Sequence, residues 1–228
     1  MTPSPLAPDL YCVMGNPVAH SRSPAIHARF AELTGEHIAY ERRLVPMDGF
    51  AQGVRDFAAQ GGRGCNVTVP FKTEAPGLAT ECSERVQLAG AANTLTFRAD
   101  GGIYADNTDG LGLVADITRN AGISLAGRDV LLVGAGGAAA GVLGPLLRAG
   151  ARHITVANRT LAKAQALVQS HSALALLQKS ELLAITPQAL DANFDVIINA
   201  TASSLAGAEV PVPAHVLRPG CLAYDMMY

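Results

Sequence analysis

Short apolar runs alternate with segments of helical spacing along the first quarter of the chain. The run at 11–14 ends at Gly-Asn-Pro, which is punctuation typical of a strand end. Apolar residues then recur at helical spacing up to Gly35 and predict a helix that Ser23 caps, with Pro24 at its first position.

The same alternation continues to residue 70. Residues 38–45 predict a strand, Asp48 is expected to cap a helix that ends near Gly61, and residues 64–69 predict a third strand closed by Pro70. The order β-α-β-α-β is typical of a parallel sheet with covering helices.

A hairpin and a helix separate this part from the rest of the chain. Residues 92–97 and 103–105 flank a Gly-containing turn and predict antiparallel strands. Thr108 is then expected to cap a helix that stops near Gly122. We place the domain boundary there, with residues 1–110 as one domain, 111–228 as a second, and 111–123 as the linking helix.

The second half predicts a Rossmann-like series of parallel strands and helices. The expected elements are a strand at 129–133, a glycine turn, a helix to Arg148, a strand at 153–156, a helix from Thr160, and strands at 195–198 and 221–224. Residues 164–190 are rich in Ala, Leu and Gln, and the pattern does not divide them. The fold class is therefore α/β, with two α/β domains, the first with a mainly parallel sheet.

Residues 130–147 form an uncharged run of a length that would suit a membrane span. The run contains five glycines and Pro145, and there is no second run of this kind. We therefore interpret it as a strand, a glycine turn and a packed helix.

Composition excludes several classes of protein. The 228 residues are 49% hydrophobic and 16% charged, which is far from the signature of a disordered chain. The net charge of -2, with no cluster of basic residues, predicts no binding to nucleic acid or to an anionic membrane, so a small polar ligand is expected instead. Four scattered cysteines suggest neither disulfides nor a metal site. The N-terminus lacks the basic region of a secretory signal, which together with the cysteines favours the cytoplasm.

The turn after the strand at 129–133 fits a dinucleotide. Its pattern is G-x-G-x-x-A, formed by Gly134, Ala135, Gly136, Gly137, Ala138 and Ala139. Glycines at these positions let backbone N–H groups approach a pyrophosphate at a helix start. A glycine turn can also serve only for tight chain reversal, but the strand before it and the helix and strand after it favour the nucleotide.

The next strand predicts which dinucleotide binds. The acidic residue that holds an NAD ribose is absent near residue 158, and Arg159 stands there instead, with Lys163 one helical turn on. A guanidinium matches a phosphate, so NADP is the expected cofactor. Without the glycine turn, Arg159 would be an ordinary exposed arginine.

Polar residues of the first half gather where strands end or helices begin. Taken singly, each has a bland explanation as a cap or a turn residue. Taken together they provide hydroxyls, amides, one cation and one carboxylate at the edge where open α/β sheets bind ligands. They are Ser21, Ser23, Asn66, Thr68, Lys72, Asn93, Asn107 and Asp109.

These residues lie within motifs that resemble those of the shikimate dehydrogenase family. The motifs occur in the family's order and run through the whole chain, at 15–24, 66–72, 90–94, 106–110, 134–137, 158–160, 199–201 and 224–228. The resemblance implies reversible reduction of 3-dehydroshikimate to shikimate by NADPH, a step of aromatic amino-acid biosynthesis.

The resemblance also implies roles for individual residues. Ser21 and Ser23 would hold the substrate carboxylate, and Tyr228 would reach the substrate from the cofactor side. The ring hydroxyls would be held by Asn66, Thr68, Lys72, Asn93 and Asp109. The adenosine phosphate would be surrounded by Asn158, Arg159, Thr160 and Lys163, and the nicotinamide end by Thr201, Ser203 and Met226.

Two departures from the family pattern leave alternatives open. Residues 202–205 read Ala-Ser-Ser-Leu where many relatives have Ser and then Gly. The family also continues beyond the position of Tyr228 with a helix that carries a substrate-binding Gln, so the sequence is a fragment, lacks a recorded tail, or is a shortened relative with impaired closure. A quinate/shikimate dehydrogenase and a non-catalytic NADP-binding relative without the closing helix remain rival interpretations, as do a monomer and a homodimer.

The expected chemistry centres on Lys72. Reduction of a ketone leaves an alkoxide that needs a proton, and Lys72 is the proposed donor or electrostatic stabiliser. Asp109 would hold the ammonium group in its charged form. As a surface ion pair alone, the two would stabilise the fold by only about 0–1 kcal/mol.

Overall fold

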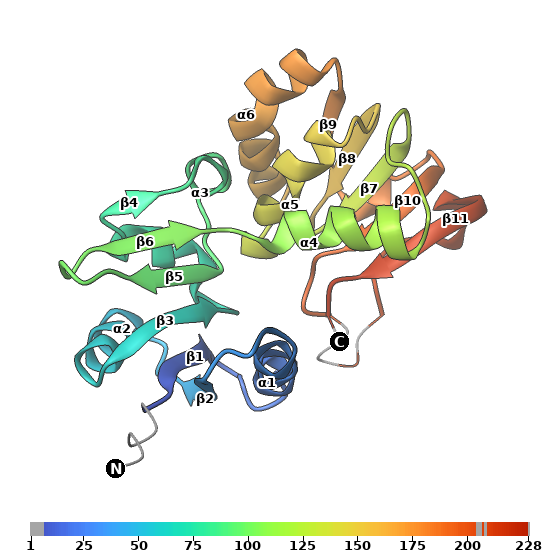
Figure 1. Ribbon diagram of the computed structural model, residues 1–228. Helices are drawn as coiled ribbons and strands as arrows, with labels where there is room; N and C mark the ends of the chain where they lie inside the picture. The colour runs from blue at the N-terminus through green and yellow to red at the C-terminus, as the bar shows by residue number, and fades with distance from the viewer. Residues whose placement is uncertain (1–6, 204–206, 208, 228) are drawn as a thin grey trace, which may run out of the picture. The chain divides into compact units, whose positions relative to one another are not determined.

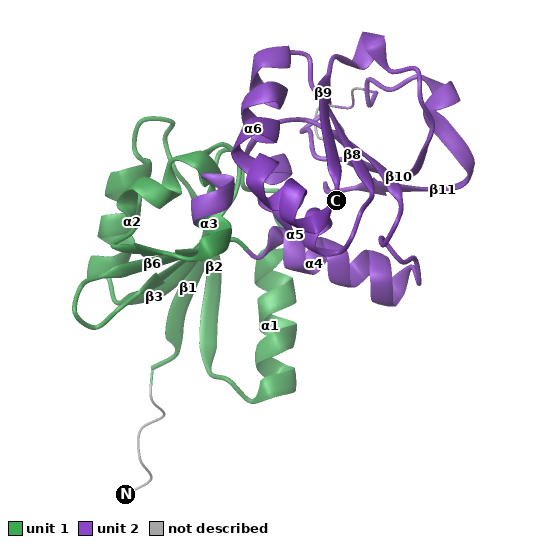
Figure 2. Ribbon diagram, turned by 90° about the horizontal axis from the view of Figure 1, so that it is seen from above, with its two compact units in different colours: residues 1–86, 91–107 green, residues 87–90, 108–228 purple. Residues whose placement is uncertain are grey.

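The computed structural model describes residues 7–203, 207 and 209–227. The chain separates into two compact units, shown in different colours in Figure 2. Unit 1 contains residues 1–86 and 91–107, and unit 2 contains residues 87–90 and 108–228. The chain therefore passes between the units three times.

Unit 1 is built on a six-stranded mixed sheet with the order β2-β1-β3-β5-β6-β4 (Figure 1). Its strands are β1 (Asp9–Gly15), β2 (Ile38–Leu44), β3 (Gly62–Val67), β4 (Glu81–Cys82), β5 (Thr94–Phe97) and β6 (Ile103–Asp106). Its helices are α1 (Ser23–Thr34), α2 (Phe50–Ala59) and the first part of α3 (Glu84–Ala89), with 3-10 turns at Phe71–Thr73 and Ala75–Leu78.

Strand direction brings several chain segments to one edge of this sheet. β1, β2 and β3 are parallel, β5 runs antiparallel to β3 and β6, and β4 is parallel to β6. The carboxyl ends of β1, β2, β3, β4 and β6 and the start of β5 therefore lie together. The predicted β-α-β-α-β order and the hairpin are confirmed, whereas β4 and α3 were not predicted.

Two predicted helix caps are wrong by one residue. The N-cap of α1 is Arg22, and Ser23 is the first helical residue. The N-cap of α2 is Gly49, and Asp48 precedes it without capping the helix. At α1 the hydroxyl of Ser21 accepts the Ser23 N–H at 3.3 Å, so the serine that serves the helix start lies two residues earlier.

Unit 2 contains a five-stranded, fully parallel sheet with the order β11-β10-β7-β8-β9. Its strands are β7 (Asp129–Val133), β8 (His153–Ala157), β9 (Glu181–Ile185), β10 (Phe194–Asn199) and β11 (Leu217–Asp225). Its helices are α4 (Asp109–Ala115), a π-helical turn (Asp116–Asn120), α5 (Gly137–Arg148) and α6 (Leu161–Gln178), with 3-10 turns at Pro187–Ala189 and Ala214–Val216.

The central strands of unit 2 are covered on both faces. Val130, Leu131, Leu132 and Val133 of β7 are all at most 1% exposed, as expected for a parallel strand between two layers. The apolar run at 130–147 is thus a buried strand, a turn and the buried helix α5, as predicted. No helix among the described residues is long and apolar enough to span a membrane.

A glycine fixes the start of α4 against α5. A Cβ atom at Gly110 would lie 2.4 Å from Pro145 Cγ and 2.6 Å from the Gly141 carbonyl oxygen. Both atoms belong to α5, and a carbonyl of a buried helix cannot move without shifting the backbone. Any side chain at position 110 would therefore push α4 and α5 apart, and glycine allows their close contact.

We expect Gly110→Ala to lower the free energy of unfolding by about 2 kcal/mol, within the range of overpacked cores. Gly112→Ala is the matched control on the same helix, because a Cβ at Gly112 meets no atom within 4 Å. That change is expected to be neutral or to stabilise by up to about 1 kcal/mol through helix propensity. Urea unfolding of the two variants checks the difference, and equal effects would contradict the close packing of α4 on α5.

The edge of unit 2 where the strands begin carries an ion network around Asp129. Arg152 donates to its carboxylate at 2.8 Å, His153 Nδ1 lies 2.7 Å away, and Arg218 bridges it to Asp195. Burial of Asp129 raises its pKa, but the hydrogen bonds from Arg152, His153 and Arg218 outweigh burial and lower the pKa to about 2. The network therefore stabilises the fold through the ionised carboxylate.

Asp129 is expected to make the stability of the protein depend on acidity. Its folded pKa lies below the unfolded value of about 3.9, so its contribution is complete above that value and is lost as the pH falls through about 2. This difference in pKa corresponds to about 2 to 3 kcal/mol of stability. Unfolding of the wild type and Asp129→Asn between pH 2 and pH 7 should show a gap that closes in acid. Asp191→Asn, an exposed acid of the same unit, is the control and should show no such gap.

Candidate functional site

The polar edge of unit 1 is organised by the amide of Asn66 at the end of β3. Tyr40 donates its hydroxyl to Asn66 Oδ1 at 2.6 Å. Asn66 Nδ2 donates to the Asn93 carbonyl and to Thr94 Oγ1, both at 3.3 Å. The ring of His27 stacks on Tyr40 at 4.1 Å, and burial lowers the pKa of His27. The half-buried Asn66 is thus held in one orientation.

Asn93 continues this cluster onto β5. Its side chain is 9% exposed, and its Oδ1 accepts the Thr94 hydroxyl at 2.9 Å. The backbone of Asn93 joins the ends of β3 and β6, because its carbonyl accepts the Val67 N–H and its N–H donates to the Asp106 carbonyl. The predicted residues Asn66 and Asn93 are therefore brought together.

Ser21 and Ser23 lie together at the turn between β1 and α1. Ser21 is 5% exposed and donates its hydroxyl to Ser23 Oγ at 3.1 Å. Arg42 of β2 donates to the Ser21 carbonyl at 2.7 Å, which holds the turn over the sheet edge. Two hydroxyls side by side at this edge have the donor chemistry that a carboxylate requires.

Thr68 and Lys72 follow β3 in a tightly fixed loop. The Thr68 N–H donates to the Met14 carbonyl at 2.9 Å, and a Cβ at Gly15 would lie 2.3 Å from the Thr68 methyl group. The Lys72 carbonyl accepts the Ala92 N–H at 2.8 Å. Lys72 itself is half-buried, and the backbone that carries it is anchored on the segment before β5.

Arg85 and Asp106 were not predicted to belong to this edge. Arg85 donates to Asp106 Oδ2 at 2.7 Å and to the Asn107 carbonyl at 3.1 Å, while the fully buried Asn107 donates to the Ala91 carbonyl. Burial alone would raise the pKa of Asp106, but the bonds from Arg85 and Ser83 lower it. Arg85 thereby fixes the end of β6, from which the chain leads to Asp109. Arg85 could not be singled out from the sequence because β4, the strand that precedes it, has only two residues.

Two predicted substrate residues lie outside unit 1. Asp109 is half-buried and is the first residue of α4, with Thr108 as N-cap, so it belongs to unit 2. It stands two residues after the buried Asn107. Tyr228 lies outside the described residues.

The glycine turn after β7 leaves backbone groups accessible. Gly134 has a φ of +111°, and a Cβ there would press on Ala200 at 3.2 Å. A Cβ at Gly136, the N-cap of α5, would meet no atom within 4 Å, and in the described part of the chain no side chain caps this helix. Ala135, Gly137 and Ala138 complete the turn and the first turn of α5. A pyrophosphate fits here because the space around Gly136 is open and no side chain caps the backbone N–H groups at the start of α5 among the described residues.

Cationic and polar residues follow β8 at the same edge. Asn158 donates its side-chain amide to the Thr160 carbonyl at 2.9 Å, and Thr160 is the N-cap of α6. Arg159 and Lys163 are exposed, on the loop and on the first turn of α6. Their exposure suits them to a phosphate that approaches from solvent.

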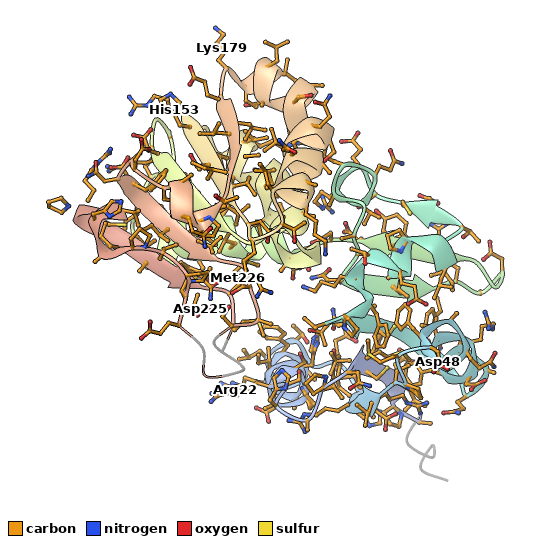
Figure 3. All side chains as sticks on the ribbon, turned by 180° about the vertical axis from the view of Figure 1, so that it is seen from behind. Arg22, Asp48, His153, Lys179, Asp225 and Met226 are labelled. Atoms are coloured by element: carbon orange, nitrogen blue, oxygen red, sulfur yellow. The ribbon has the colours of Figure 1, made fainter. Side chains whose placement is uncertain are left out.

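The loops after β10 and β11 are joined by hydrogen bonds. Thr201 donates its hydroxyl to Asn199 Oδ1 at 2.7 Å and lies 2.8 Å from the hydroxyl of Ser203. Met226 donates its N–H to the Asn199 carbonyl at 3.0 Å. Asp225 and Met226 lie at the end of unit 2 opposite to His153 (Figure 3). Asn199 and Asp225 were not assigned site roles from the sequence, although both lie in the quoted motifs.

Two family profiles match most of the chain. The profile "Shikimate dehydrogenase substrate binding domain" matches residues 13–95, and "Shikimate / quinate 5-dehydrogenase" matches residues 116–209.

Nothing in the described residues forms a group of three or more His, Cys, Asp or Glu side chains that could hold a metal ion.

Two relatives and one solved structure are similar to this chain over both units. The "Shikimate dehydrogenase (NADP(+))" of Verminephrobacter eiseniae is 82% identical over 220 residues, which are 96% of this chain and 76% of the relative. The enzyme of the same name from Acidovorax sp. is 77% identical, over 97% of this chain and 78% of the relative. The structure of shikimate 5-dehydrogenase from Thermus thermophilus, solved with NADP(H) and shikimate, matches with a TM-score of 0.80 and 30% identity, over 95% of this chain and 78% of that one.

Proposed function

The chain belongs to the shikimate dehydrogenase family, and we propose that it catalyses the reversible, NADPH-dependent reduction of 3-dehydroshikimate to shikimate, a step of aromatic amino-acid biosynthesis. The observation that carries the proposal is the pairing of two sites in one chain. Unit 1 presents a fixed edge of amides and hydroxyls, and unit 2 presents an open glycine turn followed by exposed cations.

We propose that the edge of unit 1 binds the substrate, within a domain of residues 1–110. Ser21 and Ser23 supply two adjacent hydroxyls for the carboxylate. The ring hydroxyls both donate and accept hydrogen bonds, so they need donors and acceptors on the protein. We propose that Asn66, Thr68, Asn93 and the donor Lys72 supply them, together with the acceptor Asp109, and Tyr228 is assigned to the substrate by the family pattern alone. In the bound state Asn66 offers its remaining Oδ1 lone pair, because Asn93 and Thr94 already take both of its N–H groups.

Lys72 is the proposed catalytic cation. The ammonium group stabilises negative charge that develops on the substrate oxygen and can supply the proton that this oxygen needs. Asp109 is proposed to favour the ammonium form and to direct it, because an opposite charge would stabilise a charged group. Both residues are half-buried, so their charges are screened less than those of exposed side chains.

We propose that residues 111–228 bind NADP. Gly134, Ala135, Gly136, Gly137 and Ala138 would hold the pyrophosphate, and Asn158, Arg159, Thr160 and Lys163 the adenosine phosphate. Thr201, Ser203 and Met226 would lie at the nicotinamide end. When bound, NADPH supplies the hydride; the chain supplies its position and the charge environment.

Absorbance of the reduced nicotinamide tests the function directly. Mixing the protein with shikimate and NADP+ should raise the absorbance, and removal of either should abolish the rise. A kcat/KM for quinate above that for shikimate would instead make the chain a quinate dehydrogenase. NADP binding without any turnover would make it a non-catalytic relative.

Two further assignments belong to this proposal. A small-molecule biosynthetic enzyme of this family is expected in the cytoplasm, and the protein is expected to be a monomer or a homodimer. Sedimentation at several protein concentrations distinguishes the two assembly states.

A further inference from the structure

We propose that Asn199 is a positioning residue that locks the loops after β10 and β11 into one arrangement at the nicotinamide end of the site. The inference rests on the proposed function for the identity of the ligand, but the lock itself is a property of unit 2 alone. Asn199 belongs neither to the glycine turn after β7 nor to the group of residues after β8 that includes Arg159 and Lys163.

The lock is built from three hydrogen bonds that join the side chain of Asn199 to two partners, Asp225 and Thr201. Asn199 and Asp225 are register partners on neighbouring parallel strands, and Asn199 Nδ2 donates to Asp225 Oδ2 at 3.1 Å. Asn199 Oδ1 accepts two bonds from Thr201, from the N–H at 3.1 Å and from the hydroxyl at 2.7 Å. Asn199 is only 4% exposed, so these bonds replace its contacts with water.

Further hydrogen bonds hold the segment after β11, and close packing links the same residues to the glycine turn after β7. The Asn199 carbonyl accepts the Met226 N–H at 3.0 Å, and Asp225 Oδ1 accepts the Met227 N–H at 2.8 Å. A Cβ at Gly134 would lie 3.2 Å from Ala200 and from the Thr201 methyl group. A shift of Asn199 would therefore be felt by the segments that follow β7, β10 and β11.

The side chain of Asp225 also sets the direction of the side-chain hydrogen bonds that run from Asn199 through Thr201 to Ser203. An ionised carboxylate only accepts, so the amide of Asn199 must turn its NH2 toward Asp225 and its oxygen toward Thr201. Thr201 must then donate to that oxygen, which leaves its lone pairs for Ser203. The Ser203 N–H lies 3.3 Å and its hydroxyl 2.8 Å from Thr201 Oγ1, so Ser203 donates to Thr201.

The residues that follow β8 are fixed independently. Asn158 bonds through its side chain to the Thr160 carbonyl and through its N–H to the Ile185 carbonyl. A change at Asn199 should thus affect the nicotinamide half of the site and spare the adenosine half. A residue that only stabilises the unit would affect both.

The test compares Asn199→Asp with the exchanged pair Asn199→Asp/Asp225→Asn. The single change places two carboxylates against each other and removes the donor to Asp225. The exchanged pair restores the bond with reversed polarity: the amide at 225 donates, while the carboxylate at 199 still accepts both bonds from Thr201. Asn193→Asp is the matched control, because it makes the same chemical change at an exposed position before β10.

Three quantities are measured on each variant of the full chain. They are kcat with shikimate and NADP+, the Kd for 2′,5′-ADP, which probes the adenosine half alone, and amide hydrogen exchange of residues 199–203 and 225–227 without ligand. For Asn199→Asp we expect at least a tenfold loss of kcat, a Kd for 2′,5′-ADP within twofold of the wild type, and at least tenfold faster exchange of the Thr201 and Met226 amides. The exchanged pair should return kcat and exchange to within threefold of the wild type, and Asn193→Asp should match the wild type throughout.

Every other result of these measurements either supports or overturns the inference. Unchanged exchange in Asn199→Asp overturns it, as does an exchanged pair that is as impaired as the single variant. If Asn199→Asp does not fold but the exchanged pair folds and regains protection, the inference is supported; if neither folds, it is overturned. A wild type that does not oxidise shikimate would refute the proposed function, and the exchange measurement would still decide the lock.

Discussion

Lys72→Ala is expected to lower kcat by at least about a hundredfold while the Kd for NADP+ stays within twofold of the wild type. General acid-base catalysis contributes about 10²–10⁴ in rate, and Lys72 is the cation of the proposed substrate edge. The Lys72 backbone is held by the Ala92 N–H and the neighbouring Phe71 is 2% exposed, so the variant should fold. Steady-state kinetics and cofactor titration check the prediction. A kcat near the wild-type value would remove Lys72 from catalysis.

A second substitution separates the two roles of the ammonium group. Lys72→Arg keeps a positive charge, but a guanidinium cannot release its proton at ordinary pH. Partial recovery of kcat in this variant would indicate electrostatic stabilisation, whereas a loss equal to that of Lys72→Ala would indicate proton transfer. Arg55→Ala, which removes an exposed cation on α2, is the control and should leave kcat unchanged.

Asp109→Asn extends the prediction to the proposed partner of Lys72. If Asp109 acts by holding the ammonium group, Asp109→Asn should also lower kcat. The factor by which the double variant lowers kcat should then be much smaller than the product of the two single factors. Fully multiplicative losses would show that the two residues act independently.

Strong periodic signals predicted most of the elements, and the failures have physical causes. β4 has only two residues, Glu81 and Cys82, too few for any period to be visible. The stretch at 164–190 could not be divided because α6 ends at Gln178 with Lys179 as its C-cap, and Lys179 adopts the left-handed conformation with a φ of +56°. Sequence rules expect glycine or asparagine at such a position, so the helix end gave no signal.

The residues of the candidate site could be singled out individually from the sequence, but their hydrogen-bond partners could not. Asn66 was singled out by type and by its place at a strand end. Its bonds to Asn93 and Thr94 depend on the antiparallel register that pairs Asn66 with Thr94, and its bond to Tyr40 crosses β1. The pairing of Asn199 with Asp225 likewise follows from the register of β10 and β11. Register between segments far apart in sequence is set by the packed sheet, and no local pattern encodes it.

We expect the choice between NAD and NADP to depend on the side chain of Arg159 more than on the fold. The residues after β8 bring Arg159 and Lys163 to the exposed start of α6, and no acid stands there to bond a ribose hydroxyl. A 2′-phosphate carries close to two negative charges and has three acceptor oxygens, which suit the planar fork of a guanidinium. The same glycine turn would serve NAD and NADP equally, so discrimination between them must arise at this loop.

Arg159→Ala is therefore expected to weaken NADP+ binding by at least about tenfold, equivalent to 1.4 kcal/mol, while NAD+ affinity changes less than twofold. Hydrogen bonds to charged groups contribute about 1.5–3 kcal/mol each, so loss of even one accounts for this effect. Isothermal titration with both cofactors measures it, with Arg119→Ala of the π-helical turn as an exposed arginine control. Because Arg159 is exposed, raising the salt concentration should narrow the gap between wild type and variant. Equal weakening of both cofactors would show that Arg159 shapes the loop, and unchanged NADP+ affinity would transfer the phosphate contact to Lys163.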